Sequence, residues 1–207
     1  MAELSRPGKH VEILFNPSLS KNQLLEVALL HLNGLPDTYN SLLGRNHLVN
    51  LYSEILRLKD LFLIILIIND EIIGVCSFSV GRGWKGRFLI SWIKSSINQF
   101  RIPAVLKFFS YLKYSNSLSR VLRRESEAHI LSLIIKSGFR NQKFGKKLIL
   151  SAKDYLELHN LKSLTVDCTS SEENVVNFYQ SLGFNPIFRS KDTTVLRLSL
   201  KDKFEPK

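Results

Sequence analysis

The stretch IKSGFRNQKFGKKL, residues 135–148, decides how this chain folds, because it joins an apolar segment to an amphipathic one through a basic, glycine-containing loop. Residues 128–136 are nearly continuously apolar, which is typical of a strand buried on both faces. Apolar side chains then recur at helical spacing over residues 143–159. A loop that feeds a helix start gathers unpaired backbone N–H groups at the positive end of the helix dipole. The loop therefore predicts a phosphate site, and an ordinary solvated turn with a lysine-rich first helical turn is the alternative.

Downstream of that helix, the periodicity predicts a further strand and helix followed by two strands. Ser170 and Glu173 match the capping-box pattern, and Gly183 ends the helix that they begin. The order of elements is that of an α/β protein. The expected elements are a strand over residues 164–168, a helix over 171–182, and strands over 186–189 and 193–200.

Upstream, the sequence predicts one strand, two helices and a hairpin. Ser20 and Gln23 match a capping box for the first helix. Residues 61–80 are apolar and about long enough to cross a bilayer. A polar corner at residues 69–71 interrupts them, so two short strands joined by a turn fit better. The expected elements are a strand over 10–15, a helix from Ser20 to residues 33–34, a helix over 45–58, and strands over 61–68 and 72–80.

Composition indicates one globular domain over residues 1–207, since 44% of the residues are hydrophobic and 23% are charged. The net charge of +11 points to a polyanionic ligand, partner or surface. Cys76 and Cys168 lie far apart without a Cys/His cluster, which excludes a disulfide framework and a zinc site. Residues 1–10 lack the apolar region of a secretory signal. We therefore expect a cytoplasmic protein.

A basic segment over residues 81–124 interrupts this pattern. It holds ten basic residues and no acidic one: Arg82, Lys85, Arg87, Lys94, Arg101, Lys107, Lys113, Arg120, Arg123 and Arg124. Val105, Phe108, Phe109 and Leu112 are spaced as on one face of a helix. The segment is therefore predicted to be a basic amphipathic helical insertion within the single domain.

A second motif, NFYQSLGF at residues 177–184, lies beyond the next strand. Together, the two stretches resemble the GNAT superfamily of acetyl-CoA-dependent N-acetyltransferases over residues 127–187. Family members carry Arg or Gln, two residues, Gly, one residue, then Gly or Ala after the central strand. Arg140, Lys143 and Gly145 fall on those positions, and Lys143 departs from the pattern. A lysine there would crowd the pyrophosphate or offer it a positive charge.

The resemblance implies a mixed, mostly antiparallel sheet in which a central parallel strand pair splays apart, with helices on both sides. It also implies acetyl-CoA as the acyl donor. The backbone of Leu133, Ile134 and Ile135 would meet the pantetheine arm. The pyrophosphate would bind to the loop and helix start formed by Phe139, Arg140, Asn141, Gln142, Lys143, Phe144, Gly145 and Lys146.

Tyr179 falls where many family members place the tyrosine that protonates the departing thiolate, and a phenol of pKa about 10 suits that role. A core aromatic is the alternative. An acceptor amine is mostly protonated at neutral pH, so its attack also needs a base. His129 is the first candidate, and Glu127, two residues earlier on the same side of the strand, would replace it or orient its ring. A hydrogen-bonded core histidine, with ordered water as the base, is the alternative.

We therefore expect acetyl transfer to a primary amine of a small molecule or a protein by direct attack. The basic segment has three interpretations, which are a lid over the acceptor, a helix on an anionic membrane, and, least favoured, a nucleic-acid surface. A positive wall would attract an anionic acceptor such as a nucleotide-linked amino sugar. The alternative function is a catalytically degenerate GNAT-fold module that binds an anionic membrane or nucleic acid through residues 81–124.

Overall fold

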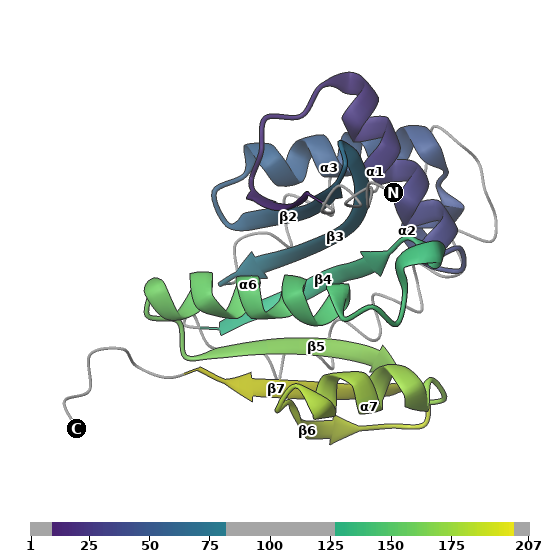
Figure 1. The fold of residues 1–207 in the computed structure, drawn as a ribbon. Helices are drawn as coiled ribbons and strands as arrows, with labels where there is room; N and C mark the ends of the chain where they lie inside the picture. Colours follow the sequence, from purple (N-terminus) through teal and green to yellow (C-terminus); the bar gives the residue numbers. More distant parts are fainter. Residues whose placement is uncertain (1–9, 82–126, 201–207) are drawn as a thin grey trace, which may run out of the picture.

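A seven-stranded sheet in the order β1-β2-β3-β4-β5-β7-β6 forms the centre of the molecule (Figure 1). The computed structural model describes residues 10–81 and 127–200, so the predicted insertion lies outside the described residues apart from Gly81. Every neighbouring strand pair is antiparallel except β4 and β5. This confirms the predicted mixed sheet. The strands are β1 (Val11–Phe15), β2 (Leu61–Ile68), β3 (Glu71–Val80), β4 (Glu127–Ile135), β5 (Ser163–Thr169), β6 (Asn185–Arg189) and β7 (Thr193–Ser199).

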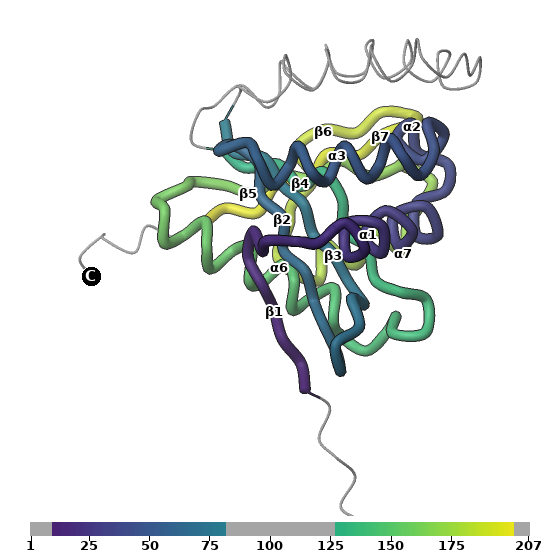
Figure 2. The backbone as a smooth tube through the Cα atoms, turned by 90° about the horizontal axis from the view of Figure 1, so that it is seen from above, coloured from purple at the N-terminus to yellow at the C-terminus, as the bar shows by residue number. Residues whose placement is uncertain are grey.

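Helices cover both faces of the sheet and form two hydrophobic cores. One core lies between the sheet and α6 and α7, and the other lies between the sheet and the three N-terminal helices. Figure 2 shows β2 and β3 between α3 and α6. The helices are α1 (Lys21–Gly34), α2 (Tyr39–Leu42), α3 (Arg45–Arg57), the short 3-10 helix η1 (Ser137–Phe139), α6 (Phe144–Leu158) and α7 (Glu173–Ser181).

The apolar stretch at residues 61–80 is the predicted hairpin. Ile68 pairs with Glu71, so Asn69 and Asp70 alone form the turn. Both have positive φ, of 48° and 65°, as the tight turns that join twisted antiparallel strands require. No helix within residues 10–81 and 127–200 combines the length and the apolar character needed to cross a membrane.

Of the two predicted capping boxes, one is confirmed and one is wrong. The Ser20 hydroxyl accepts from the Gln23 backbone at 3.3 Å, and the Gln23 side chain accepts from the Ser20 backbone at 3.0 Å. Helix α7 instead begins after Glu172, without a side-chain cap. The Ser170 hydroxyl donates to the Ser190 carbonyl at 2.9 Å, because the loop before β7 packs against it. The hydrogen bond to Ser190 therefore takes the place of the predicted cap on α7.

Strand β4 changes partners along its length, and this positions the site. Toward β3, Ile130 pairs with Phe78 and Ser132 with Ser77, so Leu131 forms a bulge. Toward β5, pairing covers only the rows from Glu127↔Ser163 to His129↔Thr165. Beyond these rows the two strands separate, as Figure 1 shows. The predicted splayed parallel pair is therefore present.

Candidate active site

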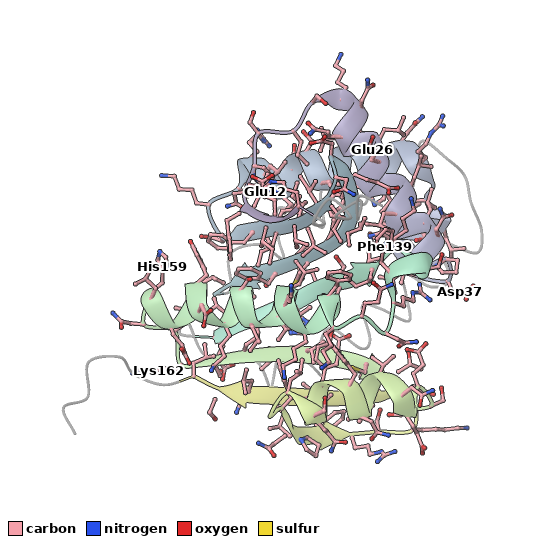
Figure 3. The ribbon with its side chains drawn as sticks, in the orientation of Figure 1. Glu12, Glu26, Asp37, Phe139, His159 and Lys162 are labelled. Carbon is pink, nitrogen blue, oxygen red and sulfur yellow. The ribbon has the colours of Figure 1, made fainter. Side chains whose placement is uncertain are left out.

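The separation of β4 from β5 leaves one edge of β4, beside η1 and the start of α6, without a strand partner among the described residues. Leu133, Ile134 and Ile135 lie along this part of β4 and pair with β3 on its other side. Figure 3 labels Asp37, between α1 and α2, and Phe139, in η1, at the end of the molecule opposite His159. The α1–α2 connection therefore borders the end at which the strands diverge.

The loop after β4 is held by short-range hydrogen bonds. The Phe139 backbone donates to the Lys136 carbonyl at 2.8 Å. The Gln142 side chain donates to the Gly138 carbonyl at 3.1 Å, and Arg140 Nε donates to the Ile135 carbonyl at 3.2 Å. Arg140 therefore ties the loop to the end of β4, and its guanidinium remains exposed.

Lys143 is the N-cap of α6 and has a left-handed backbone, with φ 64°. This explains why glycine suits the position, since a side chain costs about 1–2 kcal/mol in this conformation. Asn141 also has positive φ, of 61°. The lysine therefore adopts the backbone shape that a glycine would adopt.

The first turn of α6 presents bare backbone donors. The first intrahelical bond runs from the Lys147 N–H to the Lys143 carbonyl, so Phe144, Gly145 and Lys146 lack intrahelical acceptors. The turn has no acidic residue, and no side chain of the part of the chain that the structure describes caps it. Phe144 is buried, whereas Lys146 is exposed. These N–H groups and the helix dipole form a positive spot suited to a phosphate.

Gly145 lets α6 approach α7 closely. A Cβ at this position would lie 3.3 Å from Phe178 Cζ and 3.9 Å from Ile135 Cγ1. The contact joins the start of α6 to the two elements, β4 and α7, that carry the other candidate residues. A side chain at this position would therefore require the Phe178 ring to shift by a few tenths of an ångström.

Tyr179, on α7, is 4% exposed and packs edge-on against Phe184, with ring centroids 5.3 Å apart. Burial raises the pKa of its hydroxyl well above 10, and the neighbouring thiols of Cys76 and Cys168 and the Asp167 carboxylate raise it further. Gly183, with φ 91°, ends α7 and lets the Phe184 N–H reach the Tyr179 carbonyl. The phenol therefore remains a proton donor at neutral pH.

His129 lies in the last row that pairs β4 with β5, at the point where the strands begin to separate. Its side chain is 14% exposed, and Nε2 lies 2.8 Å from Asp167 Oδ1. Nδ1 lies 3.0 Å from the Thr165 hydroxyl. Asp167 also acts on the Tyr179 pKa, so this carboxylate links the two candidate residues electrostatically.

Asp167 and Thr165 were missed by the sequence reasoning. An aspartate within the apolar strand at residues 164–168 is unusual and was the available signal. The β4–β5 register, which sets Thr165 opposite His129, could not be read from one sequence. Strand periodicity reports which face a residue occupies but not which residue lies beside it.

The Glu127 carboxylate contacts a residue of β7, and the described contacts of the His129 ring do not include it. Its side chain is 5% exposed, and Oε1 lies 2.9 Å from Arg197 NH2 on β7. The oxygen Oε2 is buried, with no hydrogen-bond donor among the residues described. Asp167, two residues beyond Thr165 on β5, is the carboxylate that contacts the His129 ring.

A buried chain of polar groups runs from β4 into the N-terminal helices. The Ser132 hydroxyl lies 2.7 Å from that of Ser77 and 3.4 Å from the Tyr52 hydroxyl, which lies 2.8 Å from His31 Nδ1. Burial and nearby His47 lower the pKa of His31 to about 4. These contacts hold α1 and α3 against the bulged part of β4.

Comparisons with known proteins agree with this geometry. The family model described as the acetyltransferase (GNAT) family matches residues 32–184, most of the chain. A search of curated sequences finds no significant match.

Several solved structures share the fold at low identity. The ribosomal-protein-S18-alanine N-acetyltransferase of Escherichia coli is 12% identical, with a TM-score of 0.57 over 92% of this chain and 94% of that one. The PaiA N-acetyltransferase of Thermoplasma acidophilum, solved with coenzyme A, is 12% identical, with a TM-score of 0.60 over 92% and 99%. An aminoglycoside N-acetyltransferase solved with CoA is 15% identical, with a TM-score of 0.61 over 90% and 95%.

The family match covers the diverging strands, the start of α6 and the Tyr179 motif, which are the features from which the site is built. Acetyl-CoA is accordingly the acyl donor. The chain belongs to the GNAT acetyltransferase family and is an acetyl-CoA-dependent N-acetyltransferase.

Proposed function

We propose that the protein transfers the acetyl group to a primary amine of a small molecule or a protein, and that the amine attacks the thioester directly. The observation that carries this proposal is the close approach of the start of α6, at Gly145, to Ile135 at the end of β4 and to Phe178, the neighbour of Tyr179 on α7. Direct attack is favoured because both cysteines are buried and are poor nucleophiles. Burial is the main cause that raises the pKa of each thiol to about 12.

The donor would lie along β4 with its pyrophosphate at the start of α6. The backbone of Leu133, Ile134 and Ile135 would bind the pantetheine arm, since within residues 10–81 and 127–200 no strand pairs with this edge beyond His129. The loop and first helical turn, residues 139–146, would hold the pyrophosphate through backbone N–H groups. Lys143 and Lys146 add positive charge at the same place.

Acid–base roles follow from the environments of three residues. His129, with Asp167 against its Nε2, takes the first proton from the acceptor ammonium. The amine nitrogen then bonds to the carbonyl carbon, the carbon–sulfur bond breaks, and Tyr179 gives its proton to the thiolate. The nitrogen then loses its second proton to the Tyr179 phenolate, directly or through water, which restores the phenol. Glu127 is the less favoured base because its carboxylate already pairs with Arg197.

The acceptor class is narrowed by charge. A net charge of +11, ten of it in residues 81–124, favours an anionic acceptor such as a nucleotide-linked amino sugar. The names of two similar structures refer to a protein alanine and to an aminoglycoside, so both a protein amine and an amino sugar are represented on this fold. The two buried free cysteines fit a reducing, cytoplasmic setting.

The competing function is a module without turnover that binds an anionic membrane or nucleic acid through residues 81–124, which lie outside the described residues apart from Gly81. The departure at Lys143 is the observation that favours it.

Calorimetric titration with acetyl-CoA and CoA, with ATP as an anion control, separates the two functions. Binding well above that of ATP, followed by release of CoA thiol with an amine panel, is expected. Equal binding of ATP and CoA would instead favour the module, and vesicle and RNA binding assays would then be decisive.

A further inference from the structure

We propose that Tyr52 and Ser132 are positioning residues for the acyl donor, because they hold the bulge of β4 in the shape that directs the pantetheine-binding edge of this strand. The inference rests on the proposed placement of the pantetheine arm along residues 133–135. It adds a residue of α3, which reaches β4 from the side of the N-terminal helices, to those on which donor binding depends.

The bulge at Leu131 decides which face each later residue of β4 occupies. Ile130 lies in the core that the sheet forms with α6 and α7, whereas Leu131 packs against the core of the N-terminal helices. Ser132 contacts Tyr52 of α3, so it also faces the N-terminal helices. Two successive residues therefore share one face, and alternation then resumes, with Ile134 in the N-terminal core.

This shift by one residue also changes which backbone groups of β4 face each edge. Successive N–H groups of a strand point to opposite edges, so an extra residue exchanges the groups that face β3 for those that face the other edge. Beyond His129, that other edge has no strand partner among the described residues. The bulge therefore selects the N–H and C=O groups of residues 133–135 that would meet the pantetheine arm.

A chain of buried polar side chains holds the bulge. Ser132 Oγ lies 2.7 Å from Ser77 Oγ and 3.4 Å from the Tyr52 hydroxyl oxygen. The Tyr52 hydroxyl oxygen lies 2.8 Å from His31 Nδ1. All four residues are at most 7% exposed, and unpaired polar groups are costly in a core. Every contact is satisfied whether His31 Nδ1 accepts from Tyr52 or donates to it, so the chain depends on no particular tautomer.

The phosphate end of the donor would not depend on this chain of contacts. Phe144, in the first turn of α6, belongs to the core on the other face of the sheet. Gly145 packs toward Phe178 of α7 on that same face. Tyr52 lies in the core of the N-terminal helices. Loss of the Tyr52 hydroxyl should therefore weaken binding of the pantetheine arm and leave binding of the nucleotide half of CoA unchanged.

Calorimetry with two ligands tests this inference. CoA carries the pantetheine arm, whereas its nucleotide half, 3′-phospho-ADP, lacks it. We expect Tyr52→Phe and Ser132→Ala each to weaken CoA binding at least fivefold and to change the affinity for 3′-phospho-ADP less than twofold. The double variant should bind CoA no more weakly than Ser132→Ala alone, because Tyr52 acts through Ser132.

Thr194→Val is the matched control. It also removes a buried hydroxyl that bonds to another hydroxyl, that of Ser170, but it lies on β7. Its affinities for CoA and 3′-phospho-ADP should stay within twofold of wild type. Ser132→Ala, which removes a single oxygen, supplies the same comparison if Tyr52→Phe does not fold.

An equal loss of affinity for the two ligands would indicate a general loss of structure and would overturn the inference. Wild-type CoA affinity in either folded variant would overturn it as well. Hydrogen exchange of the wild-type protein tests the proposed placement of the arm separately. CoA should slow exchange in residues 133–135 more than 3′-phospho-ADP does, and equal exchange with both ligands would contradict the placement itself.

Discussion

At the scale of single residues, Tyr179 is the group on which the proposed reaction depends most directly. Burial keeps its hydroxyl protonated, and the Asp167 carboxylate, which contacts His129, raises the pKa of this hydroxyl further. Tyr179→Phe is expected to lower kcat about 100-fold, the usual scale for loss of a general acid, while CoA affinity stays within twofold. Steady-state kinetics and calorimetry measure the two effects. Tyr155→Phe, on α6, is the matched control, and an unchanged kcat in Tyr179→Phe would exclude this tyrosine as the acid.

Lys143 offers a second test at this scale, because its backbone conformation favours glycine. Lys143→Gly is expected to raise the free energy of unfolding by about 1 kcal/mol, as the relief of left-handed strain exceeds the entropy that glycine adds to the unfolded chain. Urea denaturation measures the change. Lys146→Gly, which lies inside the α6 helix, should instead destabilise by about 1 kcal/mol. Loss of stability in Lys143→Gly would contradict the proposed strain.

At the scale of elements, Gly34 allows α1 to pack closely against β4. A Cβ at Gly34 would lie 2.4 Å from Ile134 Cγ2, whereas a Cβ at Gly138 would meet nothing within 4 Å. Ile134 is buried and β-branched, so it cannot move aside easily. Gly34→Ala is therefore expected to destabilise by about 1–3 kcal/mol through overpacking.

The same pair of glycines supplies the control. Gly138→Ala should change the midpoint of urea unfolding little. Because Ile134 is among the residues proposed to meet the pantetheine arm, Gly34→Ala should also weaken acetyl-CoA binding in calorimetry. A Gly34→Ala protein as stable as wild type would show that α1 shifts freely against the strand.

At the scale of the whole molecule, two buried histidines make stability depend on pH. Burial, together with His47, lowers the pKa of His31 to about 4, and burial lowers that of His47 to about 4. Unfolded histidine has a pKa of about 6.5, so between pH 6.5 and 4 the unfolded chain binds protons that the folded chain does not. The free energy of unfolding should therefore fall as the pH falls through this window and should level off below it.

For His31 alone, proton binding lowers the free energy of unfolding by at most about 3 kcal/mol across this window. Urea unfolding at pH 7, 5.5 and 4 measures the slope. His31→Gln should reduce the slope to the part that His47 contributes, whereas His159→Gln, at the exposed end of α6, should leave the slope unchanged. If the slope in His31→Gln equals that of the wild type, His31 does not cause the pH dependence of stability.

The sequence by itself determined the elements whose causes are local. The Asn69–Asp70 turn, the Ser20 cap and the glycine that ends α7 act over a few residues, so each could be recognised from residue type and spacing. The two motifs flanking β5 likewise predicted the family and the location of the candidate site.

Only the tertiary structure decided which distant residues meet. Thr165 and Asp167 lie against His129, Arg197 rather than His129 holds Glu127, and Ser190 draws Ser170 away from capping α7. Each of these contacts joins elements separated in the chain and depends on strand register. Register follows from the packing of the whole sheet, because alternation along one strand is the same for every even shift of its partner.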